Sequence, residues 1–189
     1  MNKMLFILSG CNGAGKTTAA YDVLTELNCK EFVNADKIAL GISPFNPESV
    51  AREAGRYMLR RIDELLEREE TFAIETTLST RSYHQLVKRA SQNGYAVVIL
   101  YFWLNSPDLA VKRVAQRVSE GGHNVPEEDV RRRYFRGIAN LFNIFMNSVD
   151  LWMIYDNSSI PRKLIARGGK DWKTKVVANS LFNQMKSYV

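Results

Sequence analysis

The chain has 189 residues, of which 46% are hydrophobic and 24% charged, with 11 glycines and 5 prolines. This length and composition predict a single folded domain, and they exclude the disordered, collagen-like and fibrous classes. Two cysteines and two histidines are too few for a disulfide framework or a zinc cage, and the formal net charge of +6 favours a polyanionic ligand.

The apolar runs bear on membrane association. The longest run, residues 96–104, has nine residues, whereas about 20 are needed to cross a bilayer. The apolar run near the N-terminus is followed by Gly10 and Cys11 rather than by a small-residue cleavage site, which is not typical of a signal peptide. We therefore expect a cytoplasmic protein without membrane contact.

Five apolar, β-branched or aromatic runs predict strands, and longer stretches of helical periodicity separate them. The predicted strands cover residues 4–8, 31–34, 72–75, 96–103 and 151–155. The predicted helices cover residues 16–27, 47–69 and 82–93, a stretch that opens at Ser106-Pro107, and residues 126–148. Residues 161–178 then predict a hairpin that turns at Gly168-Gly169, and a short helix closes the chain. This alternation predicts an α/β fold with a parallel sheet covered by helices on both faces.

The strongest motif lies between the first predicted strand and the first predicted helix, where residues 10–18 read Gly-Cys-Asn-Gly-Ala-Gly-Lys-Thr-Thr. Glycines in such a loop let backbone N–H groups turn inward around a phosphate chain, and the helix N-terminus adds positive potential. We predict a P-loop in which Lys16 contacts the β- and γ-phosphates of ATP and the Thr17 hydroxyl is a ligand of Mg²⁺. The predicted nucleotide-binding residues of this loop are Gly10, Asn12, Gly13, Ala14, Gly15, Lys16, Thr17 and Thr18. The alternative is a glycine-rich turn that binds no ligand.

Two other classes of P-loop protein have signatures that the sequence lacks. A GTPase would carry an Asn-Lys-x-Asp motif and an Asp-x-x-Gly switch, and a motor or AAA-type ATPase would end an apolar strand with Asp-Asp or Asp-Glu. The third predicted strand ends instead in Glu75-Thr76-Thr77. This favours a single kinase domain over residues 1–189, of the nucleotide-kinase type of P-loop fold. We expect five parallel strands in the order 2-3-1-4-5, with the hairpin and the last helix as additions.

Two carboxylates follow predicted strands, at the edge where ligands of such sheets bind. Asp36 could accept the proton of an acceptor hydroxyl that attacks the γ-phosphate, or it could cap a helix that starts near Lys37. Glu75 would be costly to bury unpaired, so we expect it to face the cleft and accept hydrogen bonds from the substrate or from magnesium-bound water. The alternative for Glu75 is a structural pair with an arginine.

Arginines flank a glycine pair, Gly121-Gly122, and predict a lid over residues 113–136. Arg113 and Arg117 lie one helical turn apart, and Arg133 and Arg136 can share a face of the following helix, so guanidinium groups could stabilise a transferring phosphoryl group. Arg131 and Arg132 are expected to point to solvent, and His123 is expected to be a loop residue. After residue 156 the chain has seven basic residues and one acid, which indicates either a solvated basic face or a polyanion site.

Together these motifs resemble the zeta toxin family. The resemblance rests on residues 10–18, Asn34-Ala35-Asp36, Glu75-Thr76-Thr77-Leu78-Ser79, Gly121-Gly122-His123-x-Val125-Pro126, Arg132-Arg133-Tyr134-x-Arg136, Asn140-Leu141 and Asp156-Asn157-Ser158. The order is that of the family, and the motifs extend over nearly the whole of a chain that would be a short member. Zeta toxins are P-loop kinases that phosphorylate a sugar hydroxyl of UDP-N-acetylglucosamine and so poison cell-wall synthesis.

The resemblance implies a role for several residues. Lys16 would act on phosphate and Asp36 as the base, with Arg117 and Arg133 as catalytic lid arginines. Glu75 and Thr77 would join Asp36 on the acceptor, and Arg81 is a further candidate because Ser79 stands where the family has an arginine. We also expect Arg113, Arg136 and Asn157 to contact the nucleotide.

The expected reaction is Mg²⁺-dependent transfer of the ATP γ-phosphate to a hydroxyl of a small molecule, above all of a UDP-activated amino sugar. The resemblance adds an antitoxin protein as a candidate partner. One alternative is a kinase of a nucleoside, an antibiotic or a polynucleotide end. Another is a nucleotide-dependent module that hydrolyses ATP slowly while it grips RNA or a protein, although nucleic acid is the less favoured partner.

Overall fold

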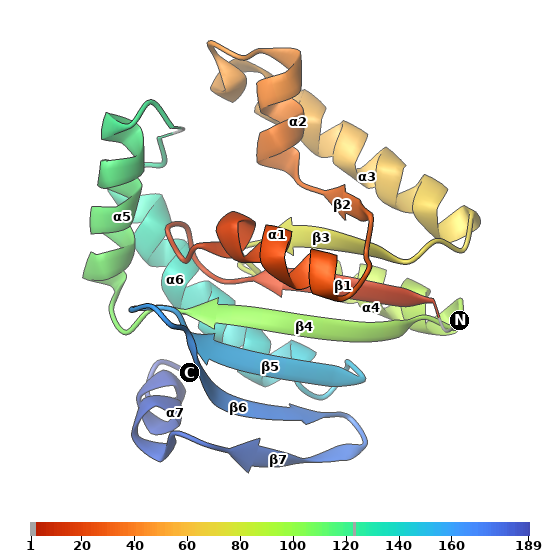
Figure 1. The fold of residues 1–189 in the computed structure, drawn as a ribbon, viewed down its shortest axis with the longest axis vertical. Helices are drawn as coiled ribbons and strands as arrows, with labels where there is room; N and C mark the ends of the chain where they lie inside the picture. The colour runs from red at the N-terminus through yellow and green to blue at the C-terminus, as the bar shows by residue number, and fades with distance from the viewer. Residues whose placement is uncertain (1–2, 123) are drawn as a thin grey trace.

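The strands form one sheet whose central part is parallel. The computed structural model describes residues 3–122 and 124–189, and the order in the sheet is β2-β3-β1-β4-β5-β6-β7 (Figure 1). The parallel strands are β1 (Met4–Ser9), β2 (Glu31–Val33), β3 (Phe72–Thr76), β4 (Ala96–Trp103) and β5 (Leu151–Asp156). The predicted order of the five parallel strands is confirmed.

The prediction that the sheet stops at five parallel strands is wrong, because the C-terminal hairpin joins it. β6 (Lys163–Gly169) pairs antiparallel with β5, and β7 (Trp172–Val176) pairs antiparallel with β6, so the described chain has a mixed sheet of seven strands. The hairpin thereby provides hydrogen-bond partners for the edge of β5, which would otherwise be open.

The hairpin turns between Gly169 and Trp172, not at the predicted glycine pair, because both glycines belong to the end of β6. Side chains would not fit there. A Cβ on Gly168 would lie 2.6 Å from the ring of Trp152, and one on Gly169 would collide with the carbonyl oxygen of Asp150.

The helices cover both faces of the sheet. Their bounds are α1 (Lys16–Glu26), α2 (Ala35–Ile42), α3 (Ala51–Glu67), α4 (Tyr83–Gln92), α5 (Pro107–Ser119), α6 (Glu127–Asn140) and α7 (Asn179–Lys186). Figure 1 shows α1 on one face and α4 and α6 on the other. The central strands are therefore buried on both sides, and Leu5, Ile7 and Ile99 are fully buried in the core. This explains the continuous apolar sequence of β1 and β4.

Three boundaries differ from the predictions. The short helix α2 follows β2 directly, where the sequence offered a helix near Lys37 only as the alternative in which Asp36 is a cap, and its N-cap is Asn34. The predicted helix over residues 47–69 begins with a 3₁₀ turn, Pro47–Val50, before α3. The predicted helix over residues 126–148 becomes α6 followed by a π-helical turn, Leu141–Phe145.

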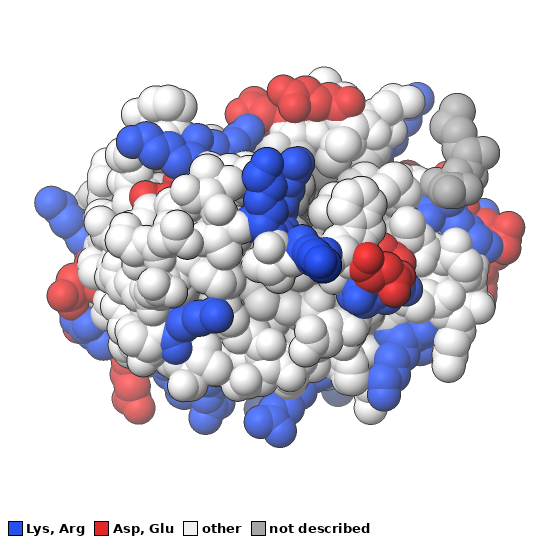
Figure 2. Space-filling model, turned by 90° about the horizontal axis from the view of Figure 1, so that it is seen from below, with Lys and Arg blue, Asp and Glu red and all other residues white. Residues whose placement is uncertain are grey.

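The basic C-terminal segment lies at the β7 end of the sheet. Figure 2 views the molecule from this end, and its Lys and Arg side chains are spread over the face and its rim rather than gathered in one continuous patch. Within the C-terminal segment, the charge of Lys170 is compensated by Asp150, whose Oδ1 lies 2.8 Å from Lys170 Nζ. This distribution favours a solvated basic face over a built polyanion site.

Within residues 3–122 and 124–189, no helix is both long enough and apolar enough to span a membrane. The predicted loop residue His123 lies outside the residues that the structure describes.

Candidate active site

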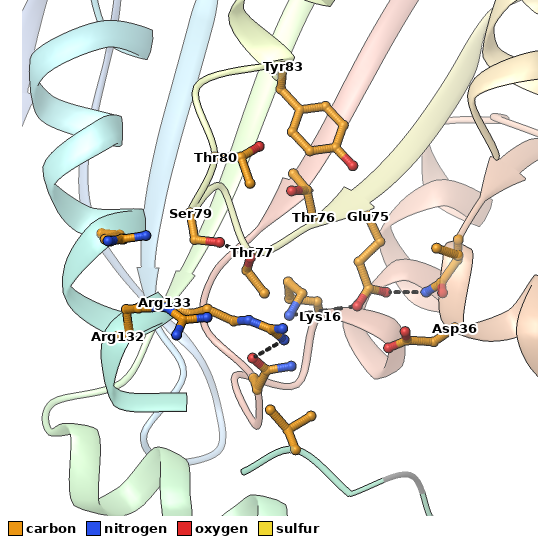
Figure 3. Close-up of a pocket in the computed structure, with 15 residues that line it drawn as sticks. Lys16, Asp36, Glu75, Thr76, Thr77, Ser79, Thr80, Tyr83, Arg132 and Arg133 are labelled. Carbon is orange, nitrogen blue, oxygen red and sulfur yellow. Dashed lines mark hydrogen bonds and ion pairs between the residues drawn. The ribbon is translucent and has the colours of Figure 1, made fainter. Parts of the chain in front are cut away.

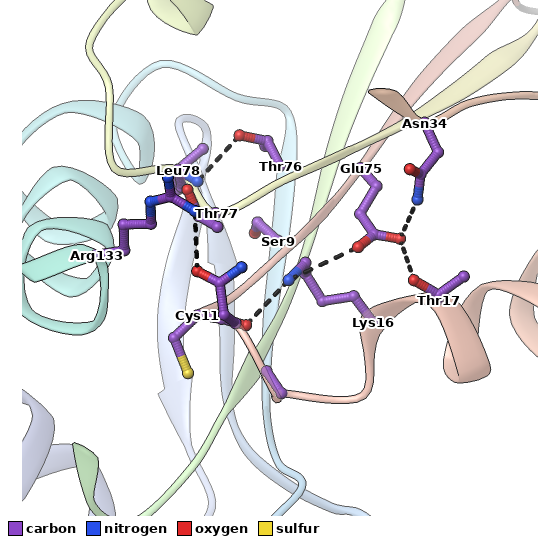
Figure 4. Close-up of polar contacts among 12 residues, drawn as sticks. Ser9, Cys11, Lys16, Thr17, Asn34, Glu75, Thr76, Thr77, Leu78 and Arg133 are labelled. Atoms are coloured by element: carbon purple, nitrogen blue, oxygen red, sulfur yellow. Dashed lines mark hydrogen bonds and ion pairs between the residues drawn. The ribbon is translucent and has the colours of Figure 1, made fainter. Parts of the chain in front are cut away.

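The loop between β1 and α1 has the backbone conformation of a phosphate cradle. Gly13 and Gly15 have φ values of 78° and 76°, which side-chain-bearing residues rarely adopt, and a Cβ on Gly13 would lie 2.8 Å from the carbonyl oxygen of Ala110. The Lys16 ammonium lies inside the curve of the loop, where it donates a hydrogen bond to the carbonyl oxygen of Cys11 at 2.9 Å (Figure 4). The alternative of a plain glycine-rich turn does not explain a lysine that is only 7% exposed.

Glu75, at the end of β3, links the loop to β2. Its Oε2 accepts hydrogen bonds from the Thr17 hydroxyl at 2.7 Å and from the Asn34 amide at 2.8 Å, and its Oε1 lies 3.7 Å from Lys16 Nζ (Figure 4). The side chain of Glu75 is 11% exposed, so its charge is compensated mainly by these partners. In the described chain the cation beside Glu75 is therefore a lysine, and the alternative of an arginine pair is wrong.

A pocket of about 430 Å³ opens beside this network. Side chains from the P-loop, α2, the end of β3 and α6 meet there (Figure 3). The lining residues are Asn12, Lys16, Asn34, Ala35, Asp36, Glu75, Thr76, Thr77, Ser79, Thr80, Tyr83, Val125, Arg132, Arg133 and Arg136.

Asp36 is exposed on this pocket from the first turn of α2. It is not the cap of that helix, because the side chain of Asn34 accepts the hydrogen bond from the Lys37 N–H at 3.1 Å. The alternative role of Asp36 as a helix cap is therefore wrong.

The loop after β3 is held in one conformation from two sides. Leu78 is fully buried with a φ of 57°, an uncommon conformation for a leucine, and its N–H donates to the Thr76 hydroxyl at 3.0 Å. Its carbonyl oxygen accepts from the Asn140 amide of α6 at 2.8 Å. Thr77 and Ser79, on either side of Leu78, hydrogen-bond each other at 2.8 Å and face the pocket.

The arginines of the predicted lid separate into two groups. Arg132, Arg133 and Arg136 line the pocket from α6, and Figure 3 shows Arg133 reaching toward Lys16, with an Nη1 contact of 3.3 Å to Asn12 Oδ1. Arg131 instead pairs with Asp108 at 2.7 Å and with Glu127 at 2.8 Å, and does not line the pocket. Arg132 is exposed, as expected, and pairs with Asp129 at 2.6 Å, but its side chain also reaches the rim of the pocket, which the sequence did not predict.

The remaining predicted site residues lie outside this pocket. Arg113 donates to the carbonyl oxygens of Asn157 and Ser158, each at 2.9 Å, and the Asn157 amide donates to the carbonyl oxygen of Ala14 at 2.8 Å. Asn157 thus holds the P-loop through Ala14, and Arg113 in turn holds Asn157 and Ser158. Arg117 packs against Gly122, where a Cβ would meet its side chain at 2.5 Å. Arg81 is exposed in the loop before α4 and is not among the lining residues.

Two lining residues, Thr80 and Tyr83, were not singled out from the sequence, and Asn34 was named only within the Asn34-Ala35-Asp36 motif, with no role for its side chain. Burial raises the pKa of the Tyr83 hydroxyl, although the Thr76 side chain has a smaller lowering effect, so Tyr83 offers the pocket a neutral hydroxyl. Burial also raises the pKa of the Cys11 thiol to about 11 against the lowering effect of Lys16, and the thiol is protonated at neutral pH.

The oxygen donors of the site fit a magnesium ion that is shared with phosphates. The described residues contain no group of three or more His, Cys, Asp or Glu side chains that could hold a metal alone. The Thr17 hydroxyl and the Glu75 carboxylate are hard oxygen donors in direct contact, which suits an ion that keeps several waters and takes its other ligands from a nucleotide.

Comparisons with known proteins agree with this fold. Residues 5–136 match the family AAA_33, described as an AAA domain. An uncharacterised protein of Haemophilus influenzae is 33% identical over 136 residues, which cover 70% of this chain and 93% of that protein. The family carries the name AAA domain, but β3 ends in Glu75-Thr76 and not in the pair of acids expected of a motor or AAA-type ATPase.

Two solved structures extend the likeness over almost the whole chain. The structure of AvrRxo1-ORF1:AvrRxo1-ORF2 with sulphate ions has a TM-score of 0.77 at 17% identity, over 99% of this chain and 64% of that chain, so this chain spans less than two thirds of its length. A structure from the PezAT chromosomal toxin-antitoxin system of Streptococcus pneumoniae has a TM-score of 0.71 at 16% identity, over 97% of this chain and 77% of that one. At these identities the likeness shows the α/β fold of P-loop kinases. The chain belongs to the family described as the AAA domain, AAA_33, and has a P-loop kinase-like domain.

Proposed function

We propose that this protein is a zeta-toxin-like kinase, which transfers the γ-phosphate of ATP to a hydroxyl of a small molecule. The preferred acceptor is a UDP-activated amino sugar such as UDP-N-acetylglucosamine. The observation that carries the proposal is the convergence of Lys16 from α1, Asp36 from α2 and Arg133 from α6 on one pocket of about 430 Å³. A cation, a free carboxylate and a guanidinium in one pocket are the groups that phosphoryl transfer to a hydroxyl requires.

Each group has a task in this reaction. Asp36 accepts the proton of the acceptor hydroxyl as its oxygen bonds to the γ-phosphorus and the bond to the bridging oxygen of ADP breaks. Lys16 and Arg133 stabilise the charge on the transferring group. Thr17 and Glu75 would hold Mg²⁺, which when bound neutralises phosphate charge. Because Glu75 contacts Lys16 and Thr17 in this structure, it must loosen both contacts when they bind the nucleotide.

A screen of acceptors tests this proposal. The protein is incubated with MgATP and UDP-sugars, nucleosides, aminoglycosides or 5′-hydroxyl oligonucleotides, and products are detected as a phosphoryl mass gain by mass spectrometry. We expect one small-molecule class to be phosphorylated and to stimulate ADP release, and Asp36→Asn to abolish both effects. If oligonucleotide ends were phosphorylated instead, the protein would be a polynucleotide-end kinase, which is the alternative kinase considered from the sequence.

The binding-module alternative predicts a different result, namely slow ATP hydrolysis that no acceptor stimulates, together with RNA binding that weakens steeply with salt. On the one face that Figure 2 shows, the basic side chains are dispersed, which does not favour RNA binding at that face. An antitoxin partner and a cytoplasmic location stay predictions from the sequence.

A further inference from the structure

A second cavity, of about 670 Å³, adjoins the candidate active site between α3 and α4. We call it the α3–α4 cavity. It shares Ala35, Thr80 and Tyr83 with the pocket around Asp36, so the two sites are neighbours on either side of these residues. Its volume is that of a small-molecule site.

The α3–α4 cavity has an apolar floor and a basic rim. The buried side chains of Met58, Ile62 and Leu86 form part of the floor. Three exposed arginines belong to the rim: Arg52, Arg56 and Arg89.

Only part of the charge on this rim is compensated. Arg89 pairs with Asp63 at 2.7 Å. Among the ion pairs of residues 3–122 and 124–189, none includes Arg52 or Arg56. These two arginines lie one turn apart on the same face of α3 and offer two positive charges to one ligand.

A glycine in α3 keeps the cavity open. Gly55 lines the α3–α4 cavity, and a Cβ built on it would meet no atom within 4 Å. A glycine inside a helix costs about 0.5–1 kcal/mol relative to alanine, and neither a left-handed φ nor a close backbone contact requires one here. A larger side chain at position 55 would occupy the space next to the helix backbone and make the cavity smaller.

We propose that the α3–α4 cavity binds the part of the phosphate acceptor that is remote from the reacting hydroxyl, and that this part combines an apolar body with an anionic group. The floor covers the apolar body, and Arg52 and Arg56 pair with the anion. The inference rests on the proposed function, and it defines the acceptor class: small neutral sugars and polyols lack the part that this cavity recognises.

A binding experiment tests the cavity without relying on catalysis. The probe is 1-anilinonaphthalene-8-sulfonate, an aromatic anion, titrated by fluorescence against the full chain and its variants. We expect Gly55→Leu to weaken its binding by at least about tenfold, because the leucine side chain occupies the part of the cavity beside Gly55 and clashes with a bound aromatic ring. The matched control is Gly41→Leu in α2, where a Cβ also meets no atom within 4 Å and no cavity is filled, and its affinity should equal that of the wild type.

A second variant tests the basic rim of the cavity without changing Gly55. The double variant Arg52→Gln/Arg56→Gln changes only exposed side chains and should weaken the same probe by about fivefold through loss of charge pairing. Circular dichroism confirms the fold of each variant. Unchanged probe affinity in both Gly55→Leu and the double variant would overturn the proposal.

Catalysis with paired acceptors provides the second arm. UDP-N-acetylglucosamine is compared with N-acetylglucosamine, and uridine 5′-monophosphate with uridine. We expect the anionic member of a phosphorylated pair to have the higher kcat/KM, and this preference to disappear in Gly55→Leu but not in Gly41→Leu. Equal use of both members would overturn the inference. Absence of transfer to any compound would count against the proposed function, while the fluorescence titration would still decide whether the cavity takes an aromatic anion.

Discussion

At the scale of single residues, the chemistry of the site is set by what surrounds Glu75. Its carboxylate touches Lys16, Thr17 and Asn34 in a place where little water reaches it. Lys16 and Thr17 are the two groups with which a P-loop protein binds phosphate and Mg²⁺. Glu75 balances the charge of Lys16 and accepts the hydrogen bond of Thr17, and both contacts have to loosen when these two groups bind a nucleotide.

The first residue-scale prediction concerns Lys16. Lys16→Ala should abolish acceptor-dependent ADP release, because it removes the ammonium group that neutralises the transferring phosphate in the transition state. Glu75 keeps its hydrogen bonds to Thr17 and Asn34, so the fold should persist by circular dichroism. Lys30→Ala, at an exposed position outside the pocket, is the control. Unchanged turnover in Lys16→Ala would mean that the P-loop is not the catalytic centre.

The second residue-scale prediction separates the base from a structural role. Asp36→Asn should lower kcat by roughly 10²–10⁴, the usual scale for loss of a general base, and leave ATP affinity nearly unchanged. Helix α2 should not suffer, because its cap is Asn34 and not Asp36. The measurement is steady-state kinetics at saturating acceptor together with equilibrium ATP binding. If Asp36→Asn kept activity close to that of the wild type, a group other than Asp36 would have to accept the proton of the attacking hydroxyl.

At the scale of elements, α6 connects the two halves of the site. It presents Arg132, Arg133 and Arg136 to the pocket, and its last residue, Asn140, fixes the loop that carries Thr77. A Cβ on Gly137, between them, would lie 2.7 Å from the carbonyl oxygen of Thr77, so α6 and this loop are in backbone contact. A shift of α6 would therefore move the arginines and the acceptor-side hydroxyls together.

The prediction at this scale contrasts arginines on two sides of α6. Arg133→Ala should lower kcat more than it raises the KM for ATP, because its guanidinium acts on charge that develops during transfer, and lysine should restore little since it lacks the planar fork. Arg131→Ala is the matched control and should have a small effect, because Arg131 is occupied by Asp108 and Glu127 at the surface. Arg132→Ala should fall between the two. Equal small losses at all three positions would indicate a diffuse basic surface.

At the scale of the whole molecule, the sequence predicted what local patterns determine. β1 and β4 are continuous apolar runs because both their faces are buried, and the P-loop is readable because its glycines and Lys16 are fixed in spacing. The addition of the hairpin to the sheet was missed because it depends on pairing between β5 and β6, which no local pattern specifies. The partners of Glu75 were missed for the same reason, since the register that sets Leu8 beside Glu75 joins distant segments.

The hairpin and α7 also decide whether the described chain unfolds as one unit. Phe182 and Met185 of α7 are buried in the same core cluster as β1 and β4, and the Tyr188 ring packs against Tyr134 of α6 at a centroid distance of 5.9 Å. A segment that shares its core with the P-loop sheet and touches the helix of the pocket arginines should unfold together with them. This follows because a cooperative unit is defined by a common core.

Phe182→Ala tests this at the level of the whole molecule. Removal of a buried phenylalanine ring should lower the free energy of unfolding by about 3 kcal/mol. In urea titrations, the transition followed by far-UV circular dichroism should coincide with the one followed by tryptophan fluorescence, and both should move to lower urea by the same amount. MgATP, which the proposed function assigns to the P-loop after β1, should raise the midpoint of both transitions in the wild type and in the variant, since a ligand of the native state stabilises the whole cooperative unit. Two separate transitions, of which only one responds to MgATP, would show that the C-terminal hairpin and α7 form a unit of their own, and the prediction of a single kinase domain would then be wrong.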